Sequence, residues 1–193
     1  MKCHLCETRG CSKGEPCSEG KGAELYKGED LSLLKTAADV EALYYCTINR
    51  LEEIMEFSRR MGYKKLGIAF CVGFSEEAKV LGEILSEEFE VCSVCCKVSS
   101  MTKDEVGAAK RPWIGEISCN PAEQARRLDE DGCEFNIVLG LCVGHDSLFY
   151  RHSKVPVTTL VVKDRVLGHN PVAALYSQYI RKNLKRSPEE RKV

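Results

Sequence analysis

Cysteine is the residue type in this chain with the most chemistry to offer, with 12 among 193 residues. Thiols stay reduced inside cells, where a high cysteine count indicates metal binding or catalysis more than disulfide bonds. A free cysteine also packs as a small apolar side chain, the role we expect for Cys46 and Cys92. Two sets of four cysteines have positions that suit a metal site.

The first set lies at the amino terminus, where Cys3, Cys6, Cys11 and Cys17 follow the spacing C-x2-C-x4-C-x5-C. Two cysteines separated by two residues can bind one metal, and the nearby glycines let the chain turn back to supply two more thiolates. Four thiolates suit zinc and an iron–sulfur cluster equally. Residues 1–22 show no hydrophobic period, so we predict that a bound metal orders them.

The second set is Cys71, Cys96, Cys119 and Cys142, each expected where a strand ends or a helix begins. In a parallel sheet these positions lie at one edge, so residues distant in sequence can meet there. We predict that they bind a cofactor, either an iron–sulfur cluster of the 4Fe-4S type or zinc. Cys95 competes with Cys96, because adjacent strand residues point to opposite faces.

Four polar residues near these cysteines are candidate catalytic groups: His145, Asp146, Lys163 and His169. Histidine and carboxylate side chains at strand ends can transfer protons or complete the coordination of a metal. The alternative is that His145 and Asp146 cap a turn, while Lys163 and Asp164 form a solvated pair. Both interpretations are open at this point.

Apolar runs predict an α/β fold with a mostly parallel sheet and helices on both of its faces. The expected strands are Lys65–Cys71, Phe89–Cys95, Phe135–Leu141 and Val157–Val162. The expected helices are Ser75–Glu88, Ala122–Asp131 and Val172–Leu184. The polar stretch from Met101 to Ile117 is long for a plain connection and is typical of a functional lid.

A helical segment precedes this body. Apolar residues repeat at helical spacing from Leu31 to Thr47, and Asn49 with Glu52 forms the pattern of a capping box for a helix that ends at Gly62. The domain prediction is therefore a Cys-rich segment at 1–22, a helical segment at 23–62, the α/β body at 63–185 and a frayed tail at 186–193.

Two short strings recur in the body. Cys71-Val72-Gly73 is repeated as Cys142-Val143-Gly144, and Asn120-Pro121 is repeated as Asn170-Pro171. In both places Asn-Pro is expected to open a helix. The repeats indicate either an internal duplication of a β/α unit or a chance likeness of short strings.

Composition excludes several classes of protein. Lys and Arg number 28 against 29 Asp and Glu, so the chain has no basic surface typical of nucleic-acid binding. No apolar run is long enough to span a membrane, and the first residues lack the apolar core of a signal peptide. We therefore expect a cytoplasmic protein whose partner is a small-molecule substrate or a redox protein.

Five strings of the body stand out together. They are Cys71-Val72-Gly73, Val94-Cys95-Cys96-Lys97-Val98, Cys119-Asn120-Pro121, Cys142-Val143-Gly144-His145-Asp146-Ser147-Leu148-Phe149 and Lys163-Asp164-Arg165-Val166-Leu167-Gly168-His169-Asn170-Pro171. With these strings the chain resembles a family of uncharacterised metal-binding proteins found in archaea and anaerobic bacteria. The resemblance covers nearly the whole chain. It implies metal binding, and the anaerobic setting of the family favours iron–sulfur over zinc.

These observations give a leading hypothesis and one alternative. The leading hypothesis is an iron–sulfur protein that performs redox or Lewis-acid chemistry on a small molecule at the carboxyl ends of the strands. The alternative is a zinc-binding module or metal carrier that is not an enzyme and acts through a protein partner.

Overall fold

The structure, a computed structural model, describes residues 1–17, 20 and 22–190. It divides into two compact units, Met1–Tyr45 and Cys46–Val193. Residues 18, 19 and 21 of the predicted Cys-rich segment, and 191–193 of the predicted tail, lie outside the described residues. The domain boundaries expected from the sequence stay predictions.

The first unit has little regular structure before its one long helix. Three short 3-10 turns, Cys3–Leu5, Gly10–Lys13 and Ala23–Leu25, precede α1 (Glu29–Tyr44). None of these turns has a buried residue. This segment is therefore not held by apolar burial, as its sequence indicates.

The second unit is built on a four-stranded parallel sheet with the order β2-β1-β3-β4. Its strands are β1 (Lys65–Phe70), β2 (Glu90–Cys95), β3 (Phe135–Leu139) and β4 (Val157–Val161). All four predicted strands are present and parallel, which confirms the predicted α/β class. Every residue of β3 is buried, as expected for a central strand covered on both faces.

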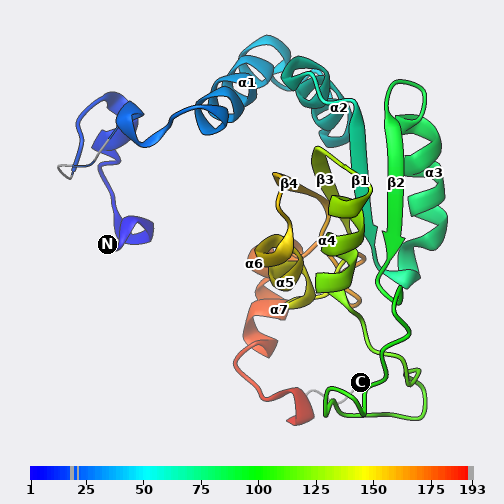
Figure 1. The fold of residues 1–193 in the computed structure, drawn as a ribbon. Coiled ribbons are helices and arrows are strands. Elements are labelled where there is room, and N and C mark those ends of the chain that lie inside the picture. Colours follow the sequence, from blue (N-terminus) through cyan, green and yellow to red (C-terminus); the bar gives the residue numbers. More distant parts are fainter. Residues whose placement is uncertain (18–19, 21, 191–193) are drawn as a thin grey trace. The chain divides into compact units, whose positions relative to one another are not determined.

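Helices cover both faces of this sheet (Figure 1). They are α2 (Arg50–Met61), α3 (Ser75–Leu85), α4 (Pro121–Glu130), α5 (His145–His152), α6 (Ala173–Tyr176) and α7 (Gln178–Asn183), with 3-10 turns at Val72–Phe74 and Pro188–Glu190. The chain crosses from β1 to β2 through α3 and returns to β3 through α4. Right-handed crossovers in opposite directions place α3 and α4 on opposite faces.

The reversal of direction creates a switch point between β1 and β3. Phe70 at the end of β1 pairs with Leu139 at the end of β3, while the connections after these strands lead to opposite sides. In open α/β sheets, ligands bind outside the carboxyl ends of the strands at such a point. This edge of the sheet is where a site is expected.

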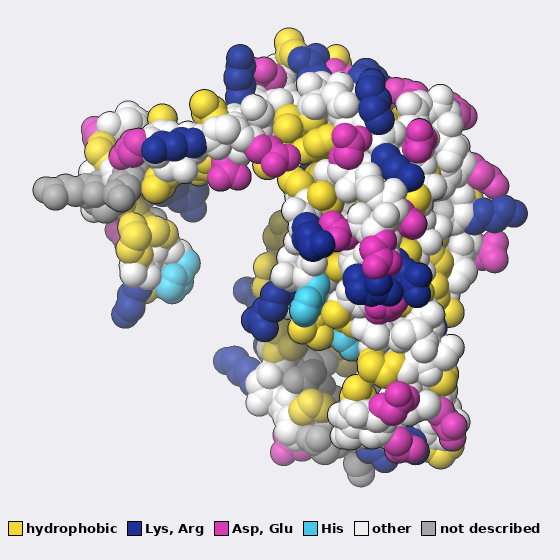
Figure 2. Space-filling model, viewed as in Figure 1, with side chains coloured by type: hydrophobic (Ala, Val, Ile, Leu, Met, Phe, Trp, Pro, Cys, Tyr) yellow, Lys and Arg dark blue, Asp and Glu magenta, His cyan; other side chains and the backbone are white. Residues whose placement is uncertain are grey.

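The outer surface of α4 is solvated and charged. Glu123 pairs with Arg126 and Arg127, and Arg126 also pairs with Glu130. Figure 2 shows the resulting mixture of acidic and basic side chains over this helix. Within the described part of the chain, no helix is long and apolar enough to cross a membrane.

The predicted helix starts are confirmed where their caps are clear. Asn49 and Glu52 form the capping box of α2, Gly62 ends that helix in a left-handed conformation, and Asn120 caps α4 with Pro121 at its first position. The predicted helix Val172–Leu184 is wrong as a continuous element. It breaks at Ser177, whose extended backbone ends α6 and whose hydroxyl accepts a hydrogen bond that starts α7.

The segment from Met101 to Ile117, predicted as a lid, is an irregular loop whose two ends are joined by hydrogen bonds. An antiparallel bridge joins Thr102 to Ile117, and a second joins Arg111 to Ile114. Lys97 Nζ donates to the Ile117 carbonyl at 2.6 Å. These bonds fix where the excursion leaves and re-enters the sheet edge, and its role as a lid stays a prediction.

The Phe74 ring approaches the backbone directly after β3 so closely that position 140 requires glycine. The φ of Gly140 is +67°, and an added Cβ would lie 2.2 Å from Cε2 of the buried Phe74 ring. No L side chain fits this position without moving Phe74, which belongs to the turn that follows β1. Glycine at position 140 therefore lets the turn after β1 pack directly against the end of β3.

We predict that Gly140→Ala lowers the free energy of unfolding by about 2 kcal/mol or more, because it combines a left-handed conformation with overpacking. Gly82→Ala within α3, where an added Cβ meets open space, is the matched control and should stabilise by about 0.5–1 kcal/mol. Urea denaturation measures both. Equal stability of the two variants would show that Phe74 does not need this glycine.

Candidate functional site

Four thiols occupy the carboxyl edge of the sheet, and three connections between strands and helices supply them. Cys71 directly follows β1, Cys96 directly follows β2, Cys119 precedes the cap of α4, and Cys142 lies shortly after β3. Cys71 and Cys96 are buried, and the other two are half-buried. We call these four residues the thiol edge.

Backbone hydrogen bonds join the strand ends and the helix start that carry Cys71, Cys96 and Cys119. The Cys71 N–H donates to the Leu139 carbonyl at 3.1 Å, which joins the ends of β1 and β3. The Cys96 N–H donates to the Phe70 carbonyl at 2.9 Å, which joins the ends of β2 and β1. The Cys96 carbonyl in turn accepts from the Asn120 N–H at 2.9 Å. The site is thus part of the sheet framework.

The four sulfur atoms form one series. The Cys71 thiol interacts with those of Cys142 and Cys96, and the Cys96 thiol interacts with that of Cys119. The Val72 N–H also donates to Cys96 Sγ at 3.3 Å. The order along the series is Cys142, Cys71, Cys96, Cys119.

Two cations from the segment after β4 lie on this series. Lys163 Nζ is 2.7 Å from Cys71 Sγ, and Arg165 Nη2 is 3.1 Å from Cys142 Sγ. At the other end, the His145 side chain hydrogen-bonds to Cys119. Positive groups thus contact both ends and the interior of the series.

This arrangement divides the thiols into two kinds. Hydrogen bonds from Cys142 and Cys96, and then from Lys163, lower the pKa of Cys71. Hydrogen bonds from Cys96 and then His145 lower the pKa of Cys119 to about 4. Both groups are therefore thiolates at neutral pH, the form that acts as a nucleophile and metal ligand.

The two remaining thiols act as donors. Cys119 and then Cys71 raise the pKa of Cys96, and Cys71 followed by burial raises the pKa of Cys142. The single S–H of Cys96 lies between two thiolates but can serve only one of them at a time. The thiol edge therefore combines two groups that favour the thiolate with two that favour the thiol.

His145 and Asp146 start α5 beside this series. The His145 N–H donates to the Cys142 carbonyl at 2.9 Å, and the hydrogen bond with Cys119 raises the pKa of its imidazole. Asp146 Oδ1 accepts from the N–H groups of Gly144 and Ser147, so this carboxylate caps the turn. Of the two, only His145 is placed to exchange a proton with a thiol.

His169 is held in a strained, well-defined orientation. Its φ is +64°, its Nδ1 accepts from the Asp164 N–H at 3.0 Å, and its ring lies 4.6 Å from that of Phe74. Because Nδ1 accepts, the neutral imidazole has its proton on Nε2. Lys163 Nζ is 5.1 Å from the centre of the same Phe74 ring, so the segment after β4 packs on the turn after β1.

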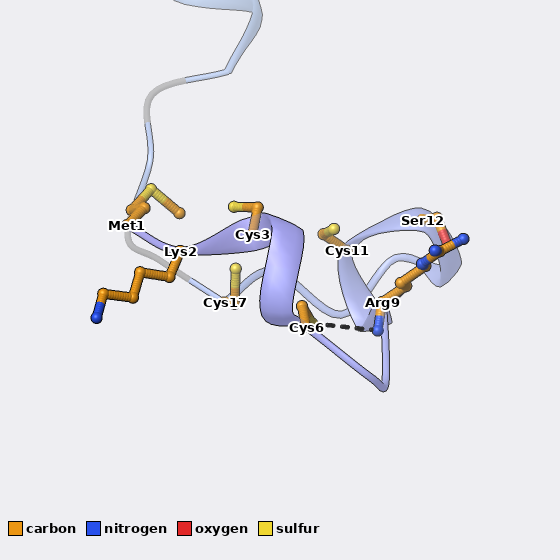
Figure 3. Close-up of a pocket in the computed structure, with 8 residues that line it drawn as sticks. All are labelled: Met1, Lys2, Cys3, Cys6, Arg9, Cys11, Ser12 and Cys17. Carbon is orange, nitrogen blue, oxygen red and sulfur yellow. Dashed lines mark hydrogen bonds between the residues drawn. The ribbon is translucent and has the colours of Figure 1, made fainter. Parts of the chain in front are cut away.

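The amino-terminal cysteines gather around a separate pocket in the first unit (Figure 3). Cys3, Cys6, Cys11 and Cys17 all line it, together with Met1, Lys2, Arg9 and Ser12. A hydrogen bond from the Arg9 N–H to Cys6 Sγ at 3.4 Å lowers the pKa of this exposed thiol. The structure therefore brings all four predicted ligands of this segment to one pocket.

The donors of the thiol edge fit a soft metal in their chemistry. Four sulfur atoms with N–H donors and cations around them are what zinc and iron–sulfur centres use. Across residues 1–17, 20 and 22–190, however, no group of three or more His, Cys, Asp or Glu side chains is arranged to hold a metal ion. The sulfurs follow one another in hydrogen-bonded order, so metal binding requires the cysteine side chains to rotate toward a common centre.

The remaining body cysteines lie apart from this series. Cys92 and Cys133 interact with each other, and burial followed by Cys92 raises the pKa of Cys133 to about 12. Cys95, the alternative to Cys96, ends the edge strand β2 and is half-buried. The structure thus places Cys96, and not Cys95, in the hydrogen-bonded series.

Three residues at the site were not selected from the sequence. They are Arg165, which stands beside the candidate Lys163, Phe74, which directly precedes the predicted helix Ser75–Glu88, and Gln124, which lies inside the predicted helix Ala122–Asp131. The spacing of Lys163 and Arg165 could have indicated that Arg165 belongs to the site. In an extended segment, side chains two residues apart point to the same side. Nothing in the sequence distinguishes Gln124 from a surface glutamine.

Comparisons with known proteins place this geometry in context. Residues 12–160 match a family described as "Protein of unknown function (DUF1847)". An uncharacterized protein of Methanocaldococcus jannaschii is 48% identical over 189 residues, which are 95% of this chain and 98% of that protein.

Among solved structures, the crystal structure of Dph2 from Pyrococcus horikoshii with a 4Fe-4S cluster is similar, at 22% identity and a TM-score of 0.38. The match covers 71% of this chain and 33% of that one, so it spans about a third of Dph2.

We predict that iodoacetamide alkylates Cys119 rapidly at pH 6 in the metal-free protein, because a pKa of about 4 leaves this group ionised there. A thiol with the ordinary pKa of 9.0 would be ionised in only about one molecule in a thousand. His145→Ala removes one of the hydrogen bonds that lower this pKa and should slow the reaction. Peptide mass spectrometry measures the rates.

Cys133, with its raised pKa, is the internal control in the same experiment and should stay unmodified. If Cys119 reacts at pH 6 no faster than Cys133, the thiolate assignment is wrong.

Proposed function

The chain belongs to the DUF1847 family, and we propose that it is a metal-binding protein that holds an iron–sulfur cluster at the thiol edge and acts there on a small molecule. One observation supports this proposal above the others: four thiols from three different connections form a single series at the switch point of the sheet. If these cysteines served only as small apolar side chains, we would not expect them to cluster, or to contact Lys163 and Arg165.

The proposed ligands are Cys71, Cys96, Cys119 and Cys142. Cluster ligands must be deprotonated, and Cys71 and Cys119 already favour the thiolate. Loading therefore requires the release of protons mainly from Cys96 and Cys142. When bound, the cluster would supply a redox centre or an iron atom that acts as a Lewis acid.

The polar groups of the site have complementary roles in this proposal. Lys163 and Arg165 offset the negative charge that four thiolates bring into a half-buried place. His145 holds or moves a proton at Cys119, and the Nε2–H of His169 is available as a hydrogen-bond donor to a small molecule. Asp146 supports the turn that presents His145.

Exposed apolar side chains beside these groups support the proposal of a small-molecule ligand. Val143 and Val166 are 88% and 89% exposed, and each follows a residue of the site, Cys142 and Arg165 respectively. Val72, directly after Cys71, is also exposed. Apolar side chains thus flank cationic groups at the open side of the edge, a mixture that suits a small molecule with both apolar and polar parts.

The alternative function is a zinc-binding module or metal carrier that works through a protein partner. The amino-terminal pocket favours this alternative, because it is lined by Cys3, Cys6, Cys11 and Cys17. All four of these cysteines are exposed. An exposed set of cysteines suits metal exchange more than catalysis. In the leading proposal the same pocket binds a metal that orders its own segment.

We predict that Cys142→Ala, in protein purified without oxygen, lowers bound iron at least about tenfold and leaves the amino-terminal metal in place. Cys95→Ala is the matched control, because Cys95 belongs to the same sheet edge but not to the series, and should keep its iron. Iron, zinc and acid-labile sulfide are measured per chain. Unchanged total metal in Cys142→Ala contradicts a cluster at the thiol edge.

We also predict that chelation makes residues 1–22 protease-sensitive while the α/β body stays intact, because metal-binding free energy is folding free energy for a segment without a core. Limited proteolysis with and without chelator, read by mass spectrometry, gives the cleavage sites. Equal protection of this segment in both samples would mean that no metal orders it.

A further inference from the structure

A buried amide from α4 lies directly behind the thiol edge. Gln124 is fully buried, with a relative exposure of 0%, on the fourth residue of the helix. Its Nε2 donates to the Val94 carbonyl at 2.7 Å and to the Phe70 carbonyl at 3.1 Å. One side chain therefore joins the last residue of β1 to the penultimate residue of β2.

Both acceptors lie within two residues of a thiol of the series. The Phe70 carbonyl directly precedes Cys71 and also accepts from the Cys96 N–H at 2.9 Å. Val94 lies two residues before Cys96 on β2, which is an edge strand of the sheet. An edge strand has a neighbour on one side only, so its end depends on additional bonds such as this one.

The orientation of the amide is fixed by chemistry. Both neighbours are carbonyl oxygens, so only the NH₂ group can face them. Gln124 Oε1 is left buried without a hydrogen-bond partner among the residues described. A buried acceptor without a partner is destabilising, so the side chain is a poor choice for stability alone.

We infer that Gln124 is a positioning residue that holds Cys71 and Cys96 adjacent, and that the metal site depends on it. The inference rests on the proposed function only in taking this thiol pair as part of the site. Through Asn120, whose N–H donates to the Cys96 carbonyl, the first turn of α4 also connects Cys119 to the same frame. One helical turn thus positions three of the four thiols.

The matched control is Asn136, the other fully buried amide whose oxygen has no partner in the described chain. Its Nδ2 donates to Ser153 Oγ at 3.0 Å, and it lies near the start of β3, away from the carboxyl edge. Gln124→Glu and Asn136→Asp make the same change, from amide to carboxyl, at equally buried positions. A merely structural role predicts the same outcome for both.

The test uses the metal-free, reduced full chain and phenylarsine oxide, a trivalent arsenical. Its As=O oxygen takes the protons of two thiols and leaves as water while two As–S bonds form, so two sulfurs must lie close together. In a background with Cys119→Ser and Cys142→Ser, peptide mass spectrometry follows bridging of Cys71 to Cys96. Iron and sulfide uptake are measured separately in chains that keep all cysteines.

We expect Gln124→Glu to slow this bridging by about tenfold or more, because misplaced reacting groups lose rate steeply, while Asn136→Asp bridges at the rate of the parent. If Gln124→Glu does not fold, Gln124→Met provides the same loss of both donated bonds without a buried carboxyl. Equal slowing in the two carboxyl variants, or unchanged bridging in the Gln124 variants, overturns the inference.

The metal measurement separates this inference from the proposed function. A parent that takes up no iron but shows the difference in bridging refutes the cluster and supports Gln124 as a positioning residue. A parent that binds iron and a Gln124 variant that bridges and binds equally well supports the cluster and refutes the positioning role.

Discussion

Hydrogen bonding among four sulfur atoms at the sheet edge is the interaction on which the rest of the site depends. Cys142 and Cys96 lower the pKa of Cys71, and Cys96 lowers the pKa of Cys119, so these two groups favour the thiolate. Negative charge in a half-buried place is unfavourable unless nearby donors and cations stabilise it. The surrounding structure supplies both, through backbone N–H groups, Lys163 and the neighbouring helices.

Several elements that reach the carboxyl edge of the sheet help to stabilise this negative charge. The ends of β1, β2 and β3 are joined by backbone bonds, α4 braces them from one face through Gln124, and α5 begins on the Cys142 carbonyl. The segment after β4 then adds its cations and packs His169 on Phe74. A rigid sheet edge thus fixes thiols that lie far apart in sequence, which is what a preorganised site requires.

Much of this was predictable from local patterns. Continuous apolar runs specified four parallel strands, and the cap residues Asn49 and Asn120 specified where two helices begin. The parallel sheet then placed the cysteines after those strands at one edge. What the sequence does not show is which side chains from other elements meet there. Gln124 and Arg165 act across long separations, and the break at Ser177 depends on a hydroxyl that competes with the helix for backbone bonds.

The central claim is that the thiol edge binds an iron–sulfur cluster, and quantification of iron and acid-labile sulfide in the full chain purified without oxygen tests it most directly. The account predicts a brown protein with iron and sulfide in comparable amounts, in addition to whatever metal the amino-terminal pocket holds. A colourless protein that contains zinc at the amino-terminal pocket, and neither iron nor sulfide, would contradict it.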